Sequence, residues 1–345
     1  MKIAIVTDAW LPQTNGVVTT LQRTGECLEK MGNEVIYITP LQFKTIPLPT
    51  YPDIRLAMFP RRKVCKTLDA FGPDAIHIAT EGPLGMAAKH YCKKRKLKFT
   101  TAYHTQFPYY VRLRAPIPVA FTYAILRNFH SKSARIMVPT ESQRHELLKW
   151  GFNNVVIWSR GVDIELFKIR DKTFLKDTRP ISMYTGRVAV EKNLDAFLSL
   201  DIPGTKYIIG DGPDLQELSK KYPDARFVGF KFGEELANYM AAADVFVFPS
   251  RTDTFGIVML DAMACGVPVA AYPVTGPIDL VQNGITGVLN ENLGLAVKEA
   301  LNLSPKEARK FAEQHSWMAA TQQFYSHLEF NQREVSLKSA EEPLS

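Results

Sequence analysis

The chain has 345 residues, of which 46% are hydrophobic and 22% are charged, and its formal net charge is +7. This length exceeds what one hydrophobic core usually holds, so the composition predicts two compact domains. The cysteines Cys27, Cys65, Cys92 and Cys265 lie far apart, without a C-x-x-C pair or histidines at metal-ligand spacing. That pattern argues against a zinc site and indicates a reducing compartment. No secretory leader pattern or run of eighteen apolar residues occurs, so we expect a cytoplasmic chain that does not span a membrane.

The charge is divided unevenly along the chain. Residues 1–168 hold 24 Lys and Arg against 12 Asp and Glu, whereas residues 169–345 hold 18 against 23. Much of the basic excess lies in "RRKVCK" (61–66) and "KKRKLK" (93–98). This asymmetry predicts that the first half faces an anionic surface, although basic runs of this kind are most often simply solvated.

Short β-branched runs alternate with helix-length amphipathic segments. The predicted strands are "KIAIVTD" (2–8), "EVIYIT" (34–39), "AIHIA" (75–79), "KFTTAYH" (98–104), "RIMVPT" (135–140), "NVVIWS" (154–159), "ISMYTG" (181–186), "KYIIG" (206–210), "ARFVGF" (225–230), "DVFVFPS" (244–250) and "VPVAAY" (267–272). Buried parallel strands are nearly continuous apolar runs, and alternation with helices builds doubly wound sheets. The predicted fold is α/β, with two doubly wound parallel-sheet domains.

The domain boundary is predicted where this alternation lapses. Residues 159–180 are largely polar and end at a proline, before a new strand pattern begins. We therefore assign residues 1–168 to the first domain and begin the second at residue 169. Residues 333–345, which include "KSAEEPLS", are predicted to be a flexible tail.

Two turns in the second half favour phosphate binding. In open parallel sheets, ligands bind at the carboxyl ends of the strands. "TGRVAVEKNLDAFL" (185–198) follows a strand and precedes a helix, which brings Arg187 and Lys192 near free backbone N–H groups. Solvated surface charge explains the two residues equally well. In "IIGDGPDLQEL" (208–218), Gly210 and Gly212 permit close backbone approach, but the segment by itself is only a good turn.

The first turn argues against one large class of enzymes. "TDAWLPQTNGVVTTLQ" (7–22) stands where a dinucleotide-binding protein has G-x-G-x-x-G, and that pattern is absent. A nicotinamide or flavin oxidoreductase is therefore disfavoured. Gly16 allows backbone N–H groups to approach a bulky ligand, and a purely structural glycine is an equal alternative.

Two carboxylates lie within the segment "SRTDTFGIVMLDAMACG" (250–266). Asp253 is predicted at or just before the N-cap of a helix that Gly266 ends, and Asp261 follows eight residues later. At 1.5 Å per residue this spacing is about 12 Å along a helix, comparable with a diphosphate between two sugar rings. Ordinary helix capping is the alternative for Asp253. An unpaired acid among the apolar neighbours of Asp261 is costly to bury, which favours a functional role there.

The combination of "GRVAVEKN", "GDGP", "FVGF" and "FPSRTDTFGIVMLDAMACGVPVAA" resembles the retaining glycosyltransferases of the GT-B fold, in glycosyltransferase family 4. The resemblance runs from "PQTNGVVT" to "HSWMAATQQFYSHL". It implies two Rossmann-like domains facing across a cleft, with residues 1–168 on the acceptor side and residues 169–315 binding the nucleotide sugar. It also implies that a helix in residues 316–332 crosses back onto the first domain.

The resemblance also implies a set of site residues. The catalytic residues would be His104, Arg187, Lys192 and Asp253. The donor-binding residues would be Gly16, Gly186, Arg187, Lys192, Gly210, Gly212, Phe230, Asp253, Thr254, Phe255, Gly256 and Asp261. The acceptor side would include Glu81, Tyr103, His104 and Thr105. The family carries E-x7-E where this chain has aspartate at 253 and 261, which puts direct ribose binding by Asp261 in question.

The implied reaction is transfer of a sugar from a nucleotide sugar to a hydroxyl of a lipid, lipid-linked or glycan acceptor, forming an α-linkage. The donor would be GDP-mannose or, as second choice, UDP-glucose, with no cofactor and no metal, because the sequence has no D-x-D. A GT-B sugar-nucleotide epimerase and a non-catalytic protein that binds anionic membranes remain alternatives.

A membrane partner is also predicted, on the cytoplasmic face of the inner membrane. The segment "PVAFTYAILRNFHSK" (118–132) is expected to lay apolar side chains into the interface: Phe121, Tyr123, Ile125, Leu126 and Phe129. Nucleic acid is not an expected partner, because the basic runs lack interleaved aromatic residues.

Overall fold

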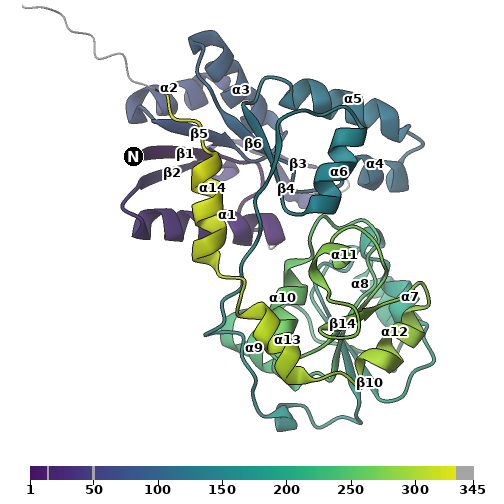
Figure 1. Cartoon of the computed structure of the whole chain (residues 1–345). Coiled ribbons are helices and arrows are strands. Elements are labelled where there is room, and N and C mark those ends of the chain that lie inside the picture. The colour runs from purple at the N-terminus through teal and green to yellow at the C-terminus, as the bar shows by residue number, and fades with distance from the viewer. Residues whose placement is uncertain (14, 49–50, 332–345) are drawn as a thin grey trace, which may run out of the picture.

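Two parallel six-stranded sheets organise the chain, each in its own domain (Figure 1). The computed structural model describes residues 1–13, 15–48 and 51–331. The first sheet has the order β2 (Glu34–Ile38), β1 (Lys2–Val6), β5 (Ala75–Ile78), β6 (Thr100–Ala102), β7 (Arg135–Val138) and β8 (Val155–Ile157). The second has the order β11 (Arg226–Phe227), β10 (Thr205–Ile209), β9 (Ile181–Thr185), β12 (Val245–Phe248), β13 (Val269–Ala271) and β14 (Gly287–Leu289). The predicted pair of doubly wound α/β domains is confirmed.

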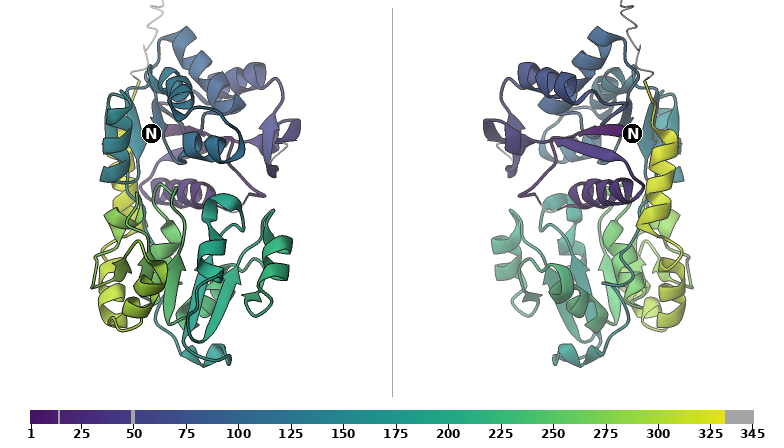
Figure 2. Two further views of the ribbon diagram at one scale, coloured as in Figure 1. Left: turned by 90° about the vertical axis from the view of Figure 1, so that its right-hand side faces the viewer. Right: turned by 90° about the vertical axis from the view of Figure 1, so that its left-hand side faces the viewer.

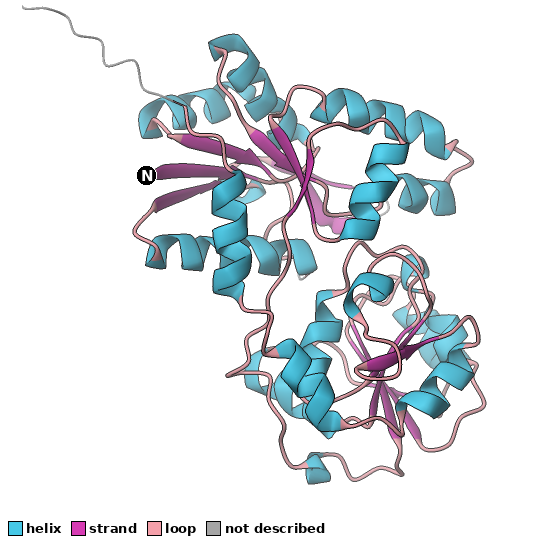
Figure 3. Ribbon diagram, in the orientation of Figure 1, coloured by secondary structure: helices cyan, strands magenta, loops and turns pink. Residues whose placement is uncertain are grey.

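Helices cover both faces of each sheet (Figure 3). The first domain contains α1 (Gly16–Lys30), α2 (Arg61–Phe71), α3 (Pro83–Arg95), α4 (Phe107–Arg114), α5 (Val119–His130), α6 (Glu141–Lys149) and the 3-10 turn η1 (Pro40–Gln42). The second contains α7 (Leu194–Leu198), α8 (Leu215–Lys221), α9 (Gly233–Ala242), α10 (Ile257–Ala264), α11 (Pro277–Leu280), α12 (Leu293–Ala300), α13 (Pro305–Ala312) and the turns η2 (Lys172–Phe174) and η3 (Val190–Lys192). The last helix is α14 (Trp317–His327).

Every predicted strand contains a strand of the structure, but three strands were missed. The antiparallel hairpin of β3 (Thr45–Leu48) and β4 (Tyr51–Ala57) carries a proline in each strand, which conceals the strand pattern. Strand β14 has the sequence "GVL", which begins with glycine and holds a single β-branched residue, so it forms no recognisable run. The hairpin is an insertion between β2 and β5 and leaves the order of the parallel strands intact.

Most strands are largely apolar because both faces of each sheet are covered. In β1, Ile3 and Ile5 belong to one core cluster, and Ala4 and Val6 belong to another on the opposite face. Successive strand side chains point to opposite faces, so a sheet between two helix layers needs apolar residues at every position. This is why continuous apolar runs predicted the strands well.

Helix α14 returns the chain to the first domain (Figure 1). It packs along α1, and Phe324 contacts the rings of Trp158 and His77 at centroid distances of 4.6 and 4.9 Å. Where the chain crosses between the domains, Val162 forms a bridge with Ser316. The domains are thus joined by two adjacent segments, while the predicted tail, 333–345, lies outside the described residues.

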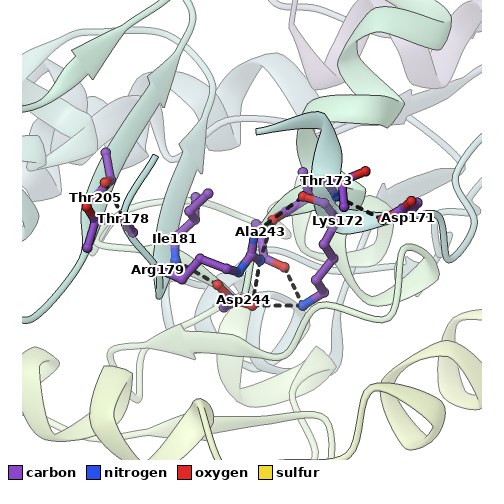
Figure 4. A network of polar contacts seen from close by, with 10 residues as sticks. Asp171, Lys172, Thr173, Thr178, Arg179, Ile181, Thr205, Ala243 and Asp244 are labelled. Atoms are coloured by element: carbon purple, nitrogen blue, oxygen red, sulfur yellow. Dashed lines mark hydrogen bonds and ion pairs between the residues drawn. The ribbon is translucent and has the colours of Figure 1, made fainter. Parts of the chain in front are cut away.

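The linker that enters the second domain is anchored by a partly exposed polar network (Figure 4). The Asp244 carboxylate accepts hydrogen bonds from Arg179 Nη2 at 2.7 Å, Lys172 Nζ at 3.0 Å and the Ile181 backbone N–H at 2.8 Å. Burial acts to raise the pKa of Asp244, but these donors outweigh it and hold the pKa below its usual value. The network ties the end of the linker to the start of β9 and β12.

The crossing point predicts a steric requirement at Gly161. A Cβ atom there would lie 2.4 Å from the Trp317 backbone nitrogen, so Gly161→Ala should lower the free energy of unfolding by about 1–3 kcal/mol. Gly294→Ala is the matched control, because its Cβ would meet neighbours only at 3.4 Å or more. Urea unfolding measures both variants, and equal stabilities would contradict the close contact.

Candidate functional site

The two domains meet through the loops that follow β6 and β12. Thr254 Oγ1 donates to the backbone oxygen of His104 at 2.7 Å, and Gln106 Nε2 donates to the backbone oxygen of Asp253 at 3.2 Å. Figure 2 shows the dark purple helix α1 at the same boundary, between the first sheet and the second domain. The carboxyl ends of the two sheets therefore face one another, with residues predicted for the site on both sides.

A largely buried ion pair lies at this boundary. Lys192 Nζ is 2.5 Å from Asp253 Oδ1, and the side chains are only 17% and 15% exposed. Burial acts to lower the pKa of Lys192, but Asp253 together with Tyr184 and Glu191 outweighs that effect and raises the pKa, so the ammonium is charged at neutral pH. The structure brings together two residues that are 61 positions apart in the sequence.

Backbone contacts between two loops position this pair. The Asn193 amide donates to the Pro249 backbone oxygen at 3.0 Å, and Ser250 Oγ donates to the Glu191 backbone oxygen at 3.2 Å. Asn193 ends η3 with φ +53°, a left-handed value that asparagine tolerates better than most residues. Hydrogen bonds from side chains to backbone oxygens therefore join the β9 loop to the β12 loop.

Helix α10 begins later than predicted. It starts at Ile257, after Gly256 with φ +80°, and a Cβ on Gly256 would lie 2.7 Å from the Met259 side chain. Asp253, Thr254 and Phe255 are therefore in the preceding loop, and Asp253 does not cap the helix. The estimate of about 12 Å assumed a helix from residue 253 onward, and the loop over residues 253–256 contradicts that assumption. The predicted end is confirmed, because Gly266 follows the C-cap with φ +71°.

Asp261 lies in the first turns of α10, close to charged groups of other segments. Burial raises its pKa to about 8, the Asp163 carboxylate adds to the rise, and Arg23 of α1 opposes it. Arg23 Nη2 is 3.3 Å from Asp163 Oδ2. Asp261 is thus mostly protonated at neutral pH in this ligand-free state.

The predicted glycines of the second domain allow strand-end loops to approach each other. A Cβ on Gly210 would lie 1.9 Å from the Gly186 oxygen, and one on Gly212 would lie 2.2 Å from the Val188 oxygen. Gly186 itself has φ +147°. The "GDG" turn therefore supports the loop that carries Arg187, which is a more specific role than an ordinary turn.

The remaining donor-side predictions lie at the same edges of the sheets. Gly16 opens α1 behind the Asn15 N-cap, and its Cβ position is 3.7 Å from Ile257 Cγ2 of α10. Phe230 follows β11, is exposed, and stacks on Phe232 at 5.8 Å with an interplanar angle of 23°. This places an exposed aromatic face beyond the strand end.

The predicted acceptor residues divide into different environments. Tyr103 is fully buried in a core cluster with Tyr123 and Phe152, so the structure does not place it at an acceptor site. It precedes His104 at the end of an extended strand, where adjacent side chains point to opposite faces. Thr105 and His104 are partly exposed, and Glu81 Oε1 is 3.2 Å from the Nε2 atom of the buried His130.

Two polar residues that sequence reasoning missed support the first domain's edge. The carboxylate of Asp8 accepts hydrogen bonds from the Leu84 and Gly85 N–H groups at 2.9 and 3.3 Å, so it caps α3. Arg160 is buried three residues beyond the end of β8, with Nη2 3.2 Å from His104 Nδ1. Asp8 ends the predicted strand "KIAIVTD" and Arg160 follows the predicted strand "NVVIWS", and a charged residue at such a position was the available signal.

Metal-ligand groups, membrane-spanning helices and hollows bear on other kinds of site in the part of the chain that the structure describes. No group of three or more His, Cys, Asp or Glu side chains there is arranged to hold a metal ion. None of its helices is both long and apolar enough to span a bilayer. A hollow of about 420 Å³ lies at the amino ends of β7 and β8, lined by Arg127, Ser133 and Asn153 among others, and none of the predicted site residues lines it.

Comparison with known proteins matches both domains to one family. The profile described as Glycosyltransferase Family 4 matches residues 14–166, and the profile described as Glycosyl transferases group 1 matches residues 179–303. A GDP-mannose-dependent alpha-mannosyltransferase of Mycolicibacterium smegmatis is 31% identical over 315 residues, covering 84% of this chain and 84% of the relative. The chain belongs to glycosyltransferase family 4.

Further relatives of this family-4 glycosyltransferase extend the comparison. An alpha-monoglucosyldiacylglycerol synthase of Streptococcus pneumoniae is 25% identical over 352 residues, covering 88% of this chain and 79% of the relative. Sucrose-phosphate synthase from Thermosynechococcus elongatus has a similar structure, with a TM-score of 0.75, 20% identity, and coverage of 94% of this chain and 97% of that chain. The predicted GT-B fold is confirmed.

The raised pKa of Asp261 predicts a pH-dependent stability. The folded state holds a proton on Asp261 up to about pH 8, whereas the unfolded chain loses it near 3.8, so stability falls as the pH rises between these values. Asp261→Asn should therefore melt at a higher temperature than the wild type, by a margin that grows from about pH 5 to 8. Asp224→Asn, at an exposed position, should show no such trend. A pH-independent margin for Asp261→Asn would contradict the assignment.

Proposed function

We propose that this glycosyltransferase is a retaining hexosyltransferase that moves mannose, or glucose as second choice, from a nucleotide sugar to a hydroxyl of a lipid, lipid-linked or glycan acceptor. The observation that carries the proposal is the buried Lys192–Asp253 pair at the domain boundary, beside the loop of His104. The name of the mycobacterial relative supports GDP-mannose, and that of the pneumococcal relative supports a lipid acceptor.

The charges of the donor domain suit a nucleoside diphosphate leaving group. As the glycosidic bond breaks, the diphosphate gains negative charge, and cationic side chains stabilise it most strongly where water is excluded. Lys192 is buried and cationic, and Arg187 lies on the same loop. We therefore assign the phosphate contacts to these two residues, with neither a metal ion nor a resident cofactor in the reaction.

Asp253 is suited to hold the hydroxyls of the donor sugar. Its Oδ1 atom pairs with Lys192, while Oδ2 is buried and has no hydrogen-bond partner among the described residues. A buried carboxylate oxygen without a donor is costly, and a sugar hydroxyl would supply one. The backbone of Thr254 to Gly256 continues from this carboxylate to α10 and would line the same sugar.

Retention is assigned to attack on the face from which the diphosphate leaves. A double displacement needs a nucleophilic carboxylate at the anomeric carbon. Asp253 is bound in the ion pair with Lys192, which lowers its nucleophilicity. We therefore propose that the leaving phosphate accepts the proton of the acceptor hydroxyl, and that the α-configuration is kept.

The donor assignment predicts a pattern of nucleoside diphosphate release. With EDTA present, GDP-mannose or else UDP-glucose should be turned over, and Asp253→Asn should lower kcat by about 100-fold or more through loss of the sugar contact. Arg187→Ala should reduce turnover as well, while Asp201→Asn, at an exposed position, serves as the control. Release of no diphosphate from any donor, or unchanged turnover in Asp253→Asn, would refute the proposal.

A second proposal concerns the partner of the basic first domain, an anionic membrane on the cytoplasmic face. Helices α2 and α3 pack side by side (Figure 1). Lys89 of α3 donates to the Asn128 backbone oxygen of α5. The turn before α2 presents Phe59, which is 91% exposed, next to Arg61 and Arg62. Exposed aromatic residues flanked by basic ones suit the headgroup region of such a membrane.

The segment 118–132 contributes less than predicted. Phe121 and Ile125 of α5 are exposed, but Tyr123, Leu126 and Phe129 are buried in the first domain. The reason is the helical period, which turns residues three and four apart toward the sheet. The membrane-facing set is therefore Phe59 with Phe121 and Ile125, together with the basic residues of α2 and α3.

Flotation with anionic vesicles tests this surface. The wild type should float at low salt and less at high salt, and the double variant Phe59→Ser with Phe121→Ser should float less because it buries less apolar area. Ile285→Ser, at an exposed position of the second domain, is the control. A wild type that stays unbound at low salt would remove the membrane proposal and leave the transferase proposal unaffected.

A further inference from the structure

Arg160 is a buried cation whose donors reach no carboxylate among the residues that the structure describes. It lies three residues beyond the end of β8 and is only 5% exposed. Its Nη1 atom donates to the backbone oxygens of Trp158 and Ser159 at 2.5 and 3.0 Å, and its guanidinium lies over the Trp158 ring at 4.4 Å. Burial lowers the pKa of Arg160 to about 9, which still leaves it charged at neutral pH. Burial of a charge without an ionic partner costs free energy of folding, which favours a functional role for Arg160.

The remaining contact of Arg160 is to His104. Arg160 Nη2 is 3.2 Å from His104 Nδ1. A guanidinium only donates hydrogen bonds, so Nδ1 must accept, and the proton of the neutral imidazole must be on Nε2. The edge of the Trp158 ring packs against the imidazole at 5.5 Å and 70°, which limits rotation of the ring. Geometry therefore selects one tautomer of His104.

The charged and titratable groups around the imidazole oppose a second proton. Burial is the main cause, and Arg160 after β8 and His77 of β5 add to it, so the pKa of His104 lies well below its usual value. The Nε2 atom is buried and has no hydrogen-bond partner among the described residues. The Nε2–H group of His104 therefore belongs to the loop after β6, which contacts the second domain through the hydrogen bond from Thr254 Oγ1 to the His104 backbone oxygen.

We propose that Arg160 is a positioning residue that holds His104 as a neutral Nε2–H donor, which binds an oxygen of the donor sugar and does not act as a general base. Catalytic histidines that serve as bases have the opposite arrangement, with a carboxylate accepting from Nδ1–H. That the bound oxygen belongs to a donor sugar rests on the proposed function. The tautomer and the charge of the His104 ring do not depend on it. This assignment disfavours the epimerase alternative, which needs a base at the sugar.

Nitrogen-15 NMR of the histidine rings tests the proposal on the ligand-free chain. The chain has seven histidines, and His104→Asn identifies the signals of His104 by their loss. In the wild type, His104 should show a protonated Nε2 and an unprotonated Nδ1, without titration, between about pH 5 and 8. A protonated Nδ1, or an imidazolium within that range, would overturn the proposal.

Variants of Arg160 separate positioning from a merely structural role. Arg160→Met should allow His104 to populate the Nδ1–H tautomer or to titrate, and should lower kcat more than it changes KM. Arg160→Lys retains a cationic donor and should restore both the ring signals and part of kcat. Thermal melting checks that each variant folds. If Arg160→Met does not fold, the wild-type nitrogen-15 spectrum still tests which ring nitrogen of His104 carries the proton. Unchanged ring signals in a folded Arg160→Met would contradict the proposal, while loss of donor turnover with the ring state intact would contradict only the proposed function.

Discussion

The site depends on the contact between the loop after β6 and the loop after β12. Through Thr254 and Gln106 the two domains exchange hydrogen bonds at the backbone of His104 and Asp253, so neither domain alone forms the site. Within the second domain, burial of the Lys192–Asp253 pair costs desolvation free energy, which an ion pair offsets only with good geometry and further hydrogen bonds. In the proposed function a nucleotide sugar supplies those further hydrogen bonds, from its phosphate to Lys192 and from its hydroxyls to Asp253. The two side chains neutralise each other, and both are largely shielded from water.

The strands and the two parallel-sheet domains were predictable because parallel strands buried on both faces are largely apolar. The donor-side residues were chosen because ligands bind where such strands end, and their role stays a prediction. Contacts between loops distant in sequence were not predictable from local pattern. The late start of α10 depends on the left-handed Gly256, and the burial of Tyr103 depends on which face its strand end presents. Arg160 was missed because a charged residue in a linker gives no sign that it is buried against a histidine in another loop.

The charge asymmetry of the sequence fits the roles that we propose for the two domains, with a membrane at the first and the nucleotide sugar at the second. The basic residues of α2 and α3 and the exposed Phe59 form the outer side of the first domain, whereas His104 and Glu81 lie at the carboxyl edge of its sheet. The acidic excess of the second half lies in the domain assigned to the donor. A lipid acceptor held at a membrane surface would reach the first domain, while the soluble nucleotide sugar would enter the second. The ring state of His104 fits this scheme, because a neutral donor orients a sugar without removing a proton from it.

The central claim is that the carboxyl edge of the second sheet binds the diphosphate of a nucleotide sugar, with Lys192 on phosphate and Asp253 on the sugar. A crystal structure of the wild type with GDP and mannose, or with UDP and glucose if that donor is the one turned over, tests it most directly. The account predicts phosphate oxygens within hydrogen-bond distance of Lys192 Nζ and Arg187, and a sugar hydroxyl donating to Asp253 Oδ2. Nucleotide bound elsewhere, for example in the hollow at the amino ends of β7 and β8, with the Lys192–Asp253 pair untouched, would contradict it.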